Sequence, residues 1–348
     1  MFMKILMITP YVTIANRKEF SKNKTGFGYM VYDIARAVAK TEQVDVLATD
    51  SRGGEFVIEG VRYLCRSIPL LLLHLLRSCN PCIIINLKKQ YHLNKSTGIR
   101  LWYYWAMSGY VDWILKKGGY DVVHIHGCTF ANELWMSLCK KQRVKYIVTL
   151  HGLNSFSDTV RLSAGGKQYE RDFLKRVVDG ESPITVISTG MKRIIEKTYR
   201  INECGNIKVV CNSFNFSDNK ELNLKVREKY EIPFEAKVLL YVGNISVNKN
   251  QIQMVEAFDL LPEELHNKTW VLFCGENHMG NDTSFEDAIR KSNSSSHLIV
   301  CGGIKKDLMP AYYQAADAVV LLSKAEGFGL SLIEGMHYGL PCAMFKDM

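Results

Sequence analysis

The sequence predicts an α/β protein with two doubly wound domains, each built on a parallel sheet. Two observations indicate this fold class. Short Val- and Ile-rich runs alternate with amphipathic helical patterns in two series, one before residue 212 and one after residue 236. The strand candidates are almost uninterrupted apolar runs, which is typical of parallel sheets covered by helices on both faces. Ligands of such folds bind at the carboxyl ends of the strands, so we expect two domains that face a cleft.

The two series fix the expected domain limits. The first contains the strand candidates KILMIT, VDVLAT, DVVHIH, KYIVTL, ITVIS and IKVVC, with helical patterns over 28–40, 130–141 and 190–199. The second contains KVLLYVG, TWVLFCG, SHLIVCG, AVVLLS and PCAMF, with helical patterns over 250–261, 283–292, 307–316 and 329–338. We therefore assign 1–212 to an N-terminal Rossmann-like domain, 213–236 to a linker and 237–348 to a C-terminal Rossmann-like domain. The second series stops soon after PCAMF, where such a domain normally continues, and we expect it to be incomplete.

Composition favours a globular, cytoplasmic protein. The chain has 348 residues, of which 47% are apolar, and this suffices for two domains with cores of their own. No apolar run reaches the roughly 20 residues of a membrane-spanning helix, and the start MFMKILMITP lacks the features of a signal peptide. The ten cysteines form no zinc pattern, because the close pair Cys79 and Cys82 has no second pair, and we expect reduced thiols.

Positive charge is concentrated in one stretch. The formal net charge is +9, and residues 62–117 carry nine basic side chains against one acid, Asp112. The same stretch contains RLWYYWAMSGYVDWILKK, whose aromatic and basic residues suit the headgroup region of an anionic membrane on the inner face of the cell. A core-facing aromatic helix with a solvated basic rim explains the pattern equally well. Nucleic acid is a weaker alternative, because no nucleic-acid-binding motif accompanies the charge.

The segment EGFGLSLIEGMHYGLP, residues 326–341, combines two glutamates with a helix start. AVVLLS is a buried strand, and a helix follows from Leu330 to Tyr338, where Gly339 and Pro341 stop it. The amides at this helix start favour an anion such as a diphosphate; they belong to Phe328, Gly329, Leu330 and Ser331.

The two glutamates, Glu326 and Glu334, then lie on either side of those amides. Glu334 follows Leu330 by one helical turn, so its carboxylate can accept hydrogen bonds from a ribose diol. Glu326 precedes the helix and can reach a sugar on the other side of the phosphates. The spacing fits a nucleotide-diphosphate sugar, although glutamates eight residues apart also occur on solvated helix faces.

Together with other segments, EGFGLSLIE resembles the glutamate-x7-glutamate signature of retaining glycosyltransferase family 4, the group 1 glycosyltransferases with the two-domain GT-B fold. The resemblance extends over nearly the whole chain, in segments of matching order: TGFGYMVYDIARAVA, DVVHIHG, VTLHG, VISTGMKRII, VVCNS, LLYVGNISVNKNQ and LIVCGGIKKDLMPAYYQAADAVVLLSKAEGFGLSLIEGMHYGLP.

The resemblance implies roles in donor binding. Glu326 matches the glutamate near the hydroxyls of the donor sugar, Glu334 the one that holds the ribose, and 328–330 the amides near the diphosphate. Lys249 corresponds to the lysine that neutralises the leaving diphosphate. Family members usually have arginine after the glycine that is Gly243 here, where this chain has Asn244. The substitution leaves a single cation for the phosphates.

The resemblance also assigns residues in the N-terminal domain. His151 matches the histidine beside the donor sugar. In HIH we expect His124 and His126 to face opposite sides of a strand, so that only His126 reaches the cleft. Gly26 and Gly28 resemble the loop that approaches the phosphates or the acceptor, but a lone G-x-G pair also fits an ordinary turn.

The implied activity is that of a retaining, metal-independent glycosyltransferase of the hexosyltransferase type. It would need no cofactor besides its nucleotide-diphosphate-sugar donor, and its acceptor would be a glycan or a lipid-linked molecule of bacterial surface polysaccharide synthesis. The sequence contains no Asp-x-Asp motif for a divalent metal. A non-catalytic nucleotide-sugar-binding protein of the same fold stays open because of Asn244. A Rossmann dehydrogenase does not fit, because the glycines after the first strand form no G-x-G-x-x-G turn.

Overall fold

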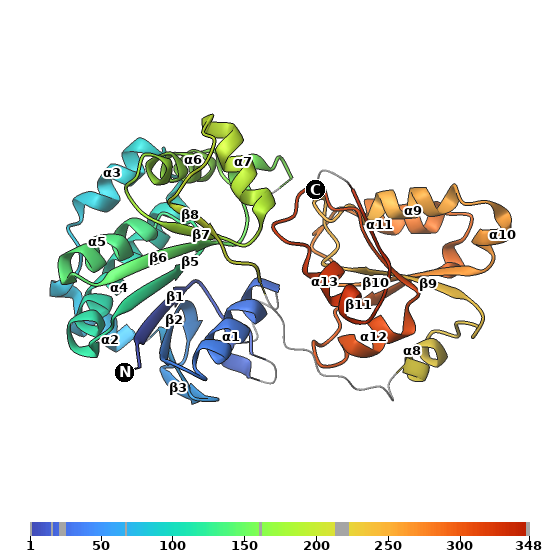
Figure 1. Cartoon of the computed structure of the whole chain (residues 1–348), viewed down its shortest axis with the longest axis horizontal. Coiled ribbons are helices and arrows are strands. Elements are labelled where there is room, and N and C mark those ends of the chain that lie inside the picture. Colours follow the sequence, from blue (N-terminus) through green and yellow to red (C-terminus); the bar gives the residue numbers. More distant parts are fainter. Residues whose placement is uncertain are drawn as a thin grey trace. The chain divides into compact units, whose positions relative to one another are not determined.

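The computed structural model describes residues 2–14, 17–20, 26–66, 68–159, 162–212 and 223–345. The chain forms two compact units, Met1–Ser213 and Phe214–Met348. Each unit is an α/β structure with its own sheet and its own helices (Figure 1).

Unit 1 is built on an eight-stranded sheet with the order β3-β4-β2-β1-β5-β6-β7-β8. Neighbouring strands are parallel, except that β3 and β4 pair antiparallel at one edge. This edge hairpin is absent from the sequence-based prediction. The strands are β1 Lys4–Thr9, β2 Gln43–Arg52, β3 Glu55–Ile58, β4 Val61–Arg66, β5 Val122–His126, β6 Lys145–Leu150, β7 Ile184–Val186 and β8 Ile207–Val209.

Side-chain caps define several helix starts of unit 1. Asn94 accepts a hydrogen bond from the amide of Thr97 at 2.9 Å, and Ser188 accepts one from the amide of Met191 at 3.2 Å. The helices are α1 Gly26–Val38, α2 Ile68–Leu73, α3 Cys82–Gln90, α4 Lys95–Gly118, α5 Asn132–Gln142, α6 Ala164–Val178 and α7 Thr189–Tyr199.

The basic aromatic stretch forms α4, and most of this helix belongs to the core of unit 1. Tyr104 and Tyr110 are buried, and α4 packs against α5. Trp102 is 40% exposed, and the side chains of Lys116 and Lys117 point to solvent. The aromatic residues of α4 therefore serve mainly to pack the unit.

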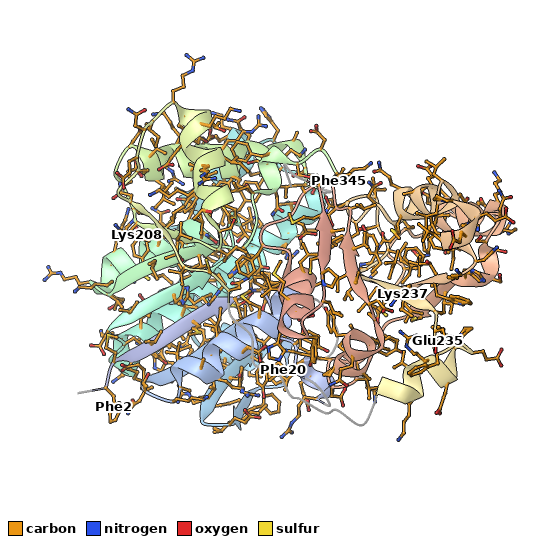
Figure 2. All side chains as sticks on the ribbon, turned by 45° about the vertical axis from the view of Figure 1, so that its right-hand side comes forward. Phe2, Phe20, Lys208, Glu235, Lys237 and Phe345 are labelled. Carbon is orange, nitrogen blue, oxygen red and sulfur yellow. The ribbon has the colours of Figure 1, made fainter. Side chains whose placement is uncertain are left out.

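Aromatic side chains pack the short helical turn Lys18–Phe20 against β3 and β4. Phe20, labelled in Figure 2, is 2% exposed and contacts Phe56 and Tyr63, with ring centroids 5.5 Å apart in each pair. These contacts attach the β3–β4 hairpin to the rest of unit 1.

Unit 2 has a five-stranded parallel sheet with the order β11-β10-β9-β12-β13. Helices α9 and α11 cover one face of the sheet, and α8 and α12 the other (Figure 1). The strands are β9 Lys237–Val242, β10 Thr269–Cys274, β11 Leu298–Gly302, β12 Ala318–Leu321 and β13 Cys342–Met344. The helices are α8 Asn223–Lys229, α9 Gln251–Asp259, α10 Glu263–His266, α11 Ser284–Lys291, α12 Met309–Ala315 and α13 Leu330–His337.

Helix α8 falls inside the segment expected to be a linker, 213–236, of which 213–222 lie outside the described residues. Arg227 attaches α8 to unit 2. Its guanidinium donates to the carbonyl oxygen of Ala315 at 3.1 Å and pairs with Asp317 at 3.1 Å. The second half of that segment is therefore part of the unit 2 structure.

Candidate functional site

The strongest candidate site of unit 2 lies where the strand order reverses. Strand β9 sits between β10 and β12, so the chain leaves β9 towards one side of the sheet and returns on the other. The crevice at the carboxyl ends of two such strands is the usual ligand site of an open α/β sheet. The loops after β9 and β12 carry Lys249 and Glu326, respectively.

Lys249 and Glu326 form an ion pair through Nζ and Oε1. Their side chains are 25% and 15% exposed, so both are largely shielded by the protein but still reached by water. Gly243, directly after β9, has a φ of +155° and lies under the lysine stem. A Cβ at this position would approach Cδ and Cε of Lys249 to 3.3 Å. Glycine at 243 thus leaves room for the lysine to extend to the glutamate.

Hydrogen bonds link the two loops. The side chain of Asn248 donates to the carbonyl oxygen of Ala325 at 3.0 Å, and the amide of Lys324 donates to the carbonyl oxygen of Asn248 at 2.8 Å. The hydroxyl of Tyr241 donates to the carbonyl oxygen of Lys249 and accepts from the amide of Leu322 at 2.8 Å. The backbone on both sides of the ion pair is therefore fixed, and no motif in the sequence marks Tyr241 for this role.

Helix α13 begins at the predicted position, after Gly329, which has a left-handed φ of +72°. Gly329 and Ser331 are buried, while Phe328 and Leu330 are partly exposed. The carbonyl of Gly329 accepts from the amide of Leu332 at 3.0 Å, which closes the first turn. The amides of Leu330 and Ser331 precede that bond and have no acceptor within the helix. This first turn can therefore bind an anion.

Glu334 lies one turn further along α13 and is held from another helix. The hydroxyl of Tyr313, on α12, donates to Oε2 of Glu334. The ring of Tyr313 is 1% exposed and stacks on Tyr338, with centroids 5.5 Å apart and planes inclined by 6°. Glu334 is thus a constrained carboxylate, not a freely solvated one.

Asn244, which replaces the expected arginine, is engaged with the neighbouring loop. Its Oδ1 accepts from the amide of Glu276 at 3.3 Å, and its Nδ2 lies 3.5 Å from Nδ1 of His278. The carbonyl oxygen of Asn244 accepts from the side chain of Gln251 at 3.2 Å. The asparagine therefore connects the carboxyl ends of β9 and β10 and adds no positive charge.

The candidate site of unit 1 is a cluster of histidines, in which His126 is buried and His124 and His151 are partly buried. Nδ1 of His126, the last residue of β5, lies 3.0 Å from Nε2 of His151, which follows β6. Nε2 of His124 lies 2.6 Å from the hydroxyl of Thr149. Nε2 of His126 and Nδ1 of His151 are buried with no hydrogen-bond partner among the described residues. The cluster therefore keeps unused hydrogen-bonding capacity.

Burial keeps these histidines neutral. Desolvation lowers the pKa of His124 to about 4 and the pKa of His151 to about 3, and His124 adds to the second shift by charge repulsion. It also holds the pKa of His126 well below its ordinary value. The site can thus offer hydrogen bonds without charge.

One expectation for this cluster is wrong. His124 and His126 do not face opposite sides of the strand, because residues two apart in a strand point to the same face. Their ring centroids are 4.1 Å apart. His126 ends β5 and His151 follows the neighbouring strand β6, and His124 lies on the same side as both.

Gly26 and Gly28 lie in the first turn of α1, not in a loop; the preceding residues 21–25 are outside the described ranges. Gly28 is packed against Thr13, whose Oγ1 would be 2.1 Å from a Cβ at position 28. Between the two glycines, the ring of Phe27 meets His151 edge to face, with centroids 5.2 Å apart. Phe27 is a neighbour of the histidine cluster that the sequence analysis missed.

Three further observations concern metals, thiols and membranes. Among the described residues, no group of three or more His, Cys, Asp or Glu side chains could hold a metal ion. All ten cysteines are free thiols. None of the helices within the described ranges has the length and apolarity to cross a bilayer.

Two family models match the chain. The model described as Glycosyltransferase Family 4 matches residues 25–217, and the model described as Glycosyl transferases group 1 matches residues 223–347. Similar curated proteins include the alpha-monoglucosyldiacylglycerol synthase of Acholeplasma laidlawii, 25% identical over 67% of this chain and 60% of its own length. Another is the N-acetyl-alpha-D-glucosaminyl L-malate synthase of Bacillus anthracis, 23% identical over 68% of this chain and 59% of its own length. The chain spans about three fifths of the length of these relatives.

Solved structures show the same fold. The Anabaena protein HepE, in complex with UDP and glucose, matches 99% of this chain and 81% of its own, with a TM-score of 0.64 and 16% identity. Sucrose-phosphate synthase from Thermosynechococcus elongatus matches 98% of this chain and 81% of its own, with a TM-score of 0.67 and 16% identity. The prediction of a GT-B fold with two Rossmann-like domains is confirmed.

Proposed function

Because the chain belongs to glycosyltransferase family 4, we propose that it moves a sugar from a nucleotide-diphosphate sugar to an acceptor hydroxyl, with retention at the anomeric carbon. The ion pair of Lys249 and Glu326 at the switch point of the unit 2 sheet is the observation that carries this proposal. A cation, a carboxylate and the first turn of α13 are grouped where a diphosphate and its sugar would bind. The complex of HepE with UDP and glucose supports a donor of this class.

In this proposal unit 2 binds the donor. The diphosphate contacts the amides of 328–331 and the ammonium of Lys249, Glu334 accepts hydrogen bonds from the ribose, and Glu326 accepts them from the sugar. Gly243 and Asn244 form the backbone beside the phosphates. Unit 1 contributes His151, which offers neutral hydrogen bonds to sugar hydroxyls. The role proposed for Gly26 and Gly28, a close approach to the phosphates or the acceptor, would fall to the first turn of α1.

The reaction exchanges one bond to the anomeric carbon for another. The bond to the diphosphate oxygen breaks, the bond to the acceptor oxygen forms, and the proton of the acceptor hydroxyl passes to the departing diphosphate or to water. Negative charge grows on the departing diphosphate, so Lys249 and the amides of α13 stabilise the transition state more than the ground state. We assign no nucleophile on the enzyme. Glu326 positions the donor and acts electrostatically.

A panel of UDP-, GDP- and ADP-sugars tests the activity. Released nucleoside diphosphate and a mass increase of one sugar on an acceptor would support transfer. The alternative, a non-catalytic nucleotide-sugar-binding protein, is favoured by one observation, the neutral Asn244 in place of a second cation. Donor binding without release of nucleoside diphosphate, for all three donors and in the presence of glycan and lipid acceptors, would establish that alternative.

We further propose that transfer needs no metal ion. The absence of an Asp-x-Asp motif and the position of Lys249 support this. Turnover should then be unchanged by EDTA. Complete loss of activity that manganese or magnesium restores would contradict the proposal.

Finally, we propose that the protein is cytoplasmic and works at the inner face of the cell membrane, on a glycan or lipid-linked acceptor of surface polysaccharide synthesis. Residues 60–111 contain no acidic side chain. Within them, Leu72, Leu73 and Leu76 are 67%, 73% and 103% exposed, close to the exposed Arg77. Exposed leucines beside basic residues suit an anionic bilayer, where each basic side chain contributes about 1 kcal/mol.

Vesicle sedimentation tests the membrane surface. Binding to phosphatidylglycerol vesicles should exceed binding to phosphatidylcholine vesicles and should fall as salt rises, because salt screens exposed charges. Leu76→Ser should weaken it, whereas Leu260→Ser, which removes an 85% exposed leucine from unit 2, should not. Vesicle binding that does not change with salt, with lipid charge or in Leu76→Ser would exclude this surface as the membrane contact.

A further inference from the structure

The contact between Tyr313 and Glu334 joins two segments that are distant in sequence. Tyr313 belongs to α12 and Glu334 to α13, and β12 lies between them in the chain. The phenol donates its proton to one oxygen of the carboxylate. A carboxylate offers about four lone-pair sites, so this bond leaves it able to accept from a ligand.

The surroundings of Tyr313 allow it little movement. Its ring is 1% exposed, lies in the core of unit 2 and stacks on Tyr338, which follows α13. Burial and the nearby Glu334 raise the pKa of Tyr313 well above its ordinary value, so the phenol stays protonated and remains a donor. A rigid, permanent donor fixes the direction of the carboxylate that it holds.

We propose that Tyr313 is a positioning residue which, by holding Glu334, sets the preference of the site for a ribose over a 2′-deoxyribose. This inference rests on the proposed contact of Glu334 with the ribose. A carboxylate meets both hydroxyls of a diol only in a narrow range of orientations, and losing the orientation penalises the ribonucleotide alone. Tyr313 itself does not touch the ligand.

The neighbouring Tyr312 provides a matched control. It lies on the same helix, is 4% exposed, and its hydroxyl is 3.1 Å from the hydroxyl of Tyr230 and 3.4 Å from Nζ of Lys229. Tyr312→Phe therefore removes one buried hydroxyl from α12 and leaves the partner of Glu334 in place. Tyr313→Phe removes the other.

Calorimetric titration with UDP, GDP and their 2′-deoxy analogues tests the inference. For the nucleotide that wild type binds, Tyr313→Phe should lower the ratio of ribo to deoxy affinity about three- to tenfold, the usual effect of one hydrogen bond. Its affinity for the deoxy analogue should stay within about twofold of wild type. Tyr312→Phe should leave the ratio unchanged. Tyr338→Leu, which removes the stacking ring, should lower the ratio in the same direction and serves if Tyr313→Phe does not fold.

The outcomes separate this inference from the proposed function. If Glu334→Gln leaves the ribo-to-deoxy ratio at its wild-type value, Glu334 does not hold the ribose, and the role proposed for it fails. If Glu334→Gln lowers the ratio and neither Tyr313→Phe nor Tyr338→Leu does, positioning by Tyr313 is wrong. Equal loss of both affinities in Tyr313→Phe would show a merely structural role and would also overturn it.

Discussion

The candidate sites of the two units differ in how they handle charge. In unit 1, His124, His126 and His151 pack together with threonines and Phe27, and desolvation keeps all three rings neutral. In unit 2, Lys249 and Glu326 form an ion pair that water still reaches. One site offers neutral hydrogen bonds, and the other offers charge.

The difference follows from what each site would have to stabilise. Sugar hydroxyls are neutral, and a buried neutral imidazole can bind them without having to stay charged away from water. A departing diphosphate carries growing negative charge, which calls for a cation. Glu326 pairs with Lys249 and fixes the position of its ammonium, which the proposed function assigns to the diphosphate.

Removing the cation should have the largest effect. Lys249→Ala should lower turnover about 100-fold or more, the usual range for one group that stabilises charge in the transition state, and it should weaken donor binding less. Asn244 brings no second cation to compensate. Steady-state kinetics together with calorimetry separate the two effects. Lys324→Ala, which removes an exposed lysine from the loop after β12, is the control. Equal turnover in wild type and Lys249→Ala would mean that groups other than Lys249 stabilise the departing diphosphate.

The two glutamates should respond differently to the same substitution. Glu334→Gln should weaken a nucleoside diphosphate and its sugar nucleotide to a similar extent, about tenfold, because both contain the ribose and an amide accepts less strongly than a carboxylate. Glu326→Gln should lower turnover about tenfold or more yet leave nucleoside diphosphate affinity unchanged or raised, because Lys249 loses its partner and stays available. Titration of each variant with both ligands measures this. If Glu326→Gln lost the nucleoside diphosphate as badly as Glu334→Gln, the separate roles would be wrong.

The sequence predicts the scaffold of both sites but not their internal contacts. Apolar runs such as KVLLYV and AVVL identify β9 and β12, and the pattern around Gly329 places the start of α13. The edge hairpin of β3 and β4 is missed, because both strands are short, β3 alternates between exposed and partly exposed residues, and Arg62 interrupts the apolar residues of β4. A local pattern finds the elements that local propensity determines.

Side-chain partners depend on tertiary packing and escape such patterns. Nothing near EGFGLSLIE indicates that Tyr313 on α12 would hold Glu334, or that Tyr241 would connect the loops of Lys249 and Leu322. The depressed pKa values of the histidines likewise depend on burial that only the folded unit provides. The exposed leucines of 72–76 show the same limit: they belong to an apolar run, yet the sequence does not tell whether such a run is buried or exposed in the folded unit.

The neutral cluster of unit 1 should make stability, rather than turnover or binding, depend on pH. Unfolded histidines titrate near pH 6.5, whereas His124 and His151 have folded pKa values of about 4 and about 3. Stability is not reduced by these histidines above pH 6.5, where they are neutral in the folded and in the unfolded protein. Stability is lost as pH falls from 6.5 towards 4, because in this range the histidines bind protons only in the unfolded chain.

Between pH 6.5 and its folded pKa, each of these two histidines should then cost about 1.4 kcal/mol of stability per pH unit. His126→Gln removes one titrating ring and should make the fall in melting temperature between pH 7 and pH 5 less steep. The control is His92→Asn, which replaces an exposed histidine outside the cluster by a residue that tolerates the positive φ at that position. Thermal denaturation of the three proteins across this range provides the measurement. If His126→Gln melted with the same pH dependence as wild type, the histidines of unit 1 would not be held neutral, and the contrast with the charged site of unit 2 would disappear.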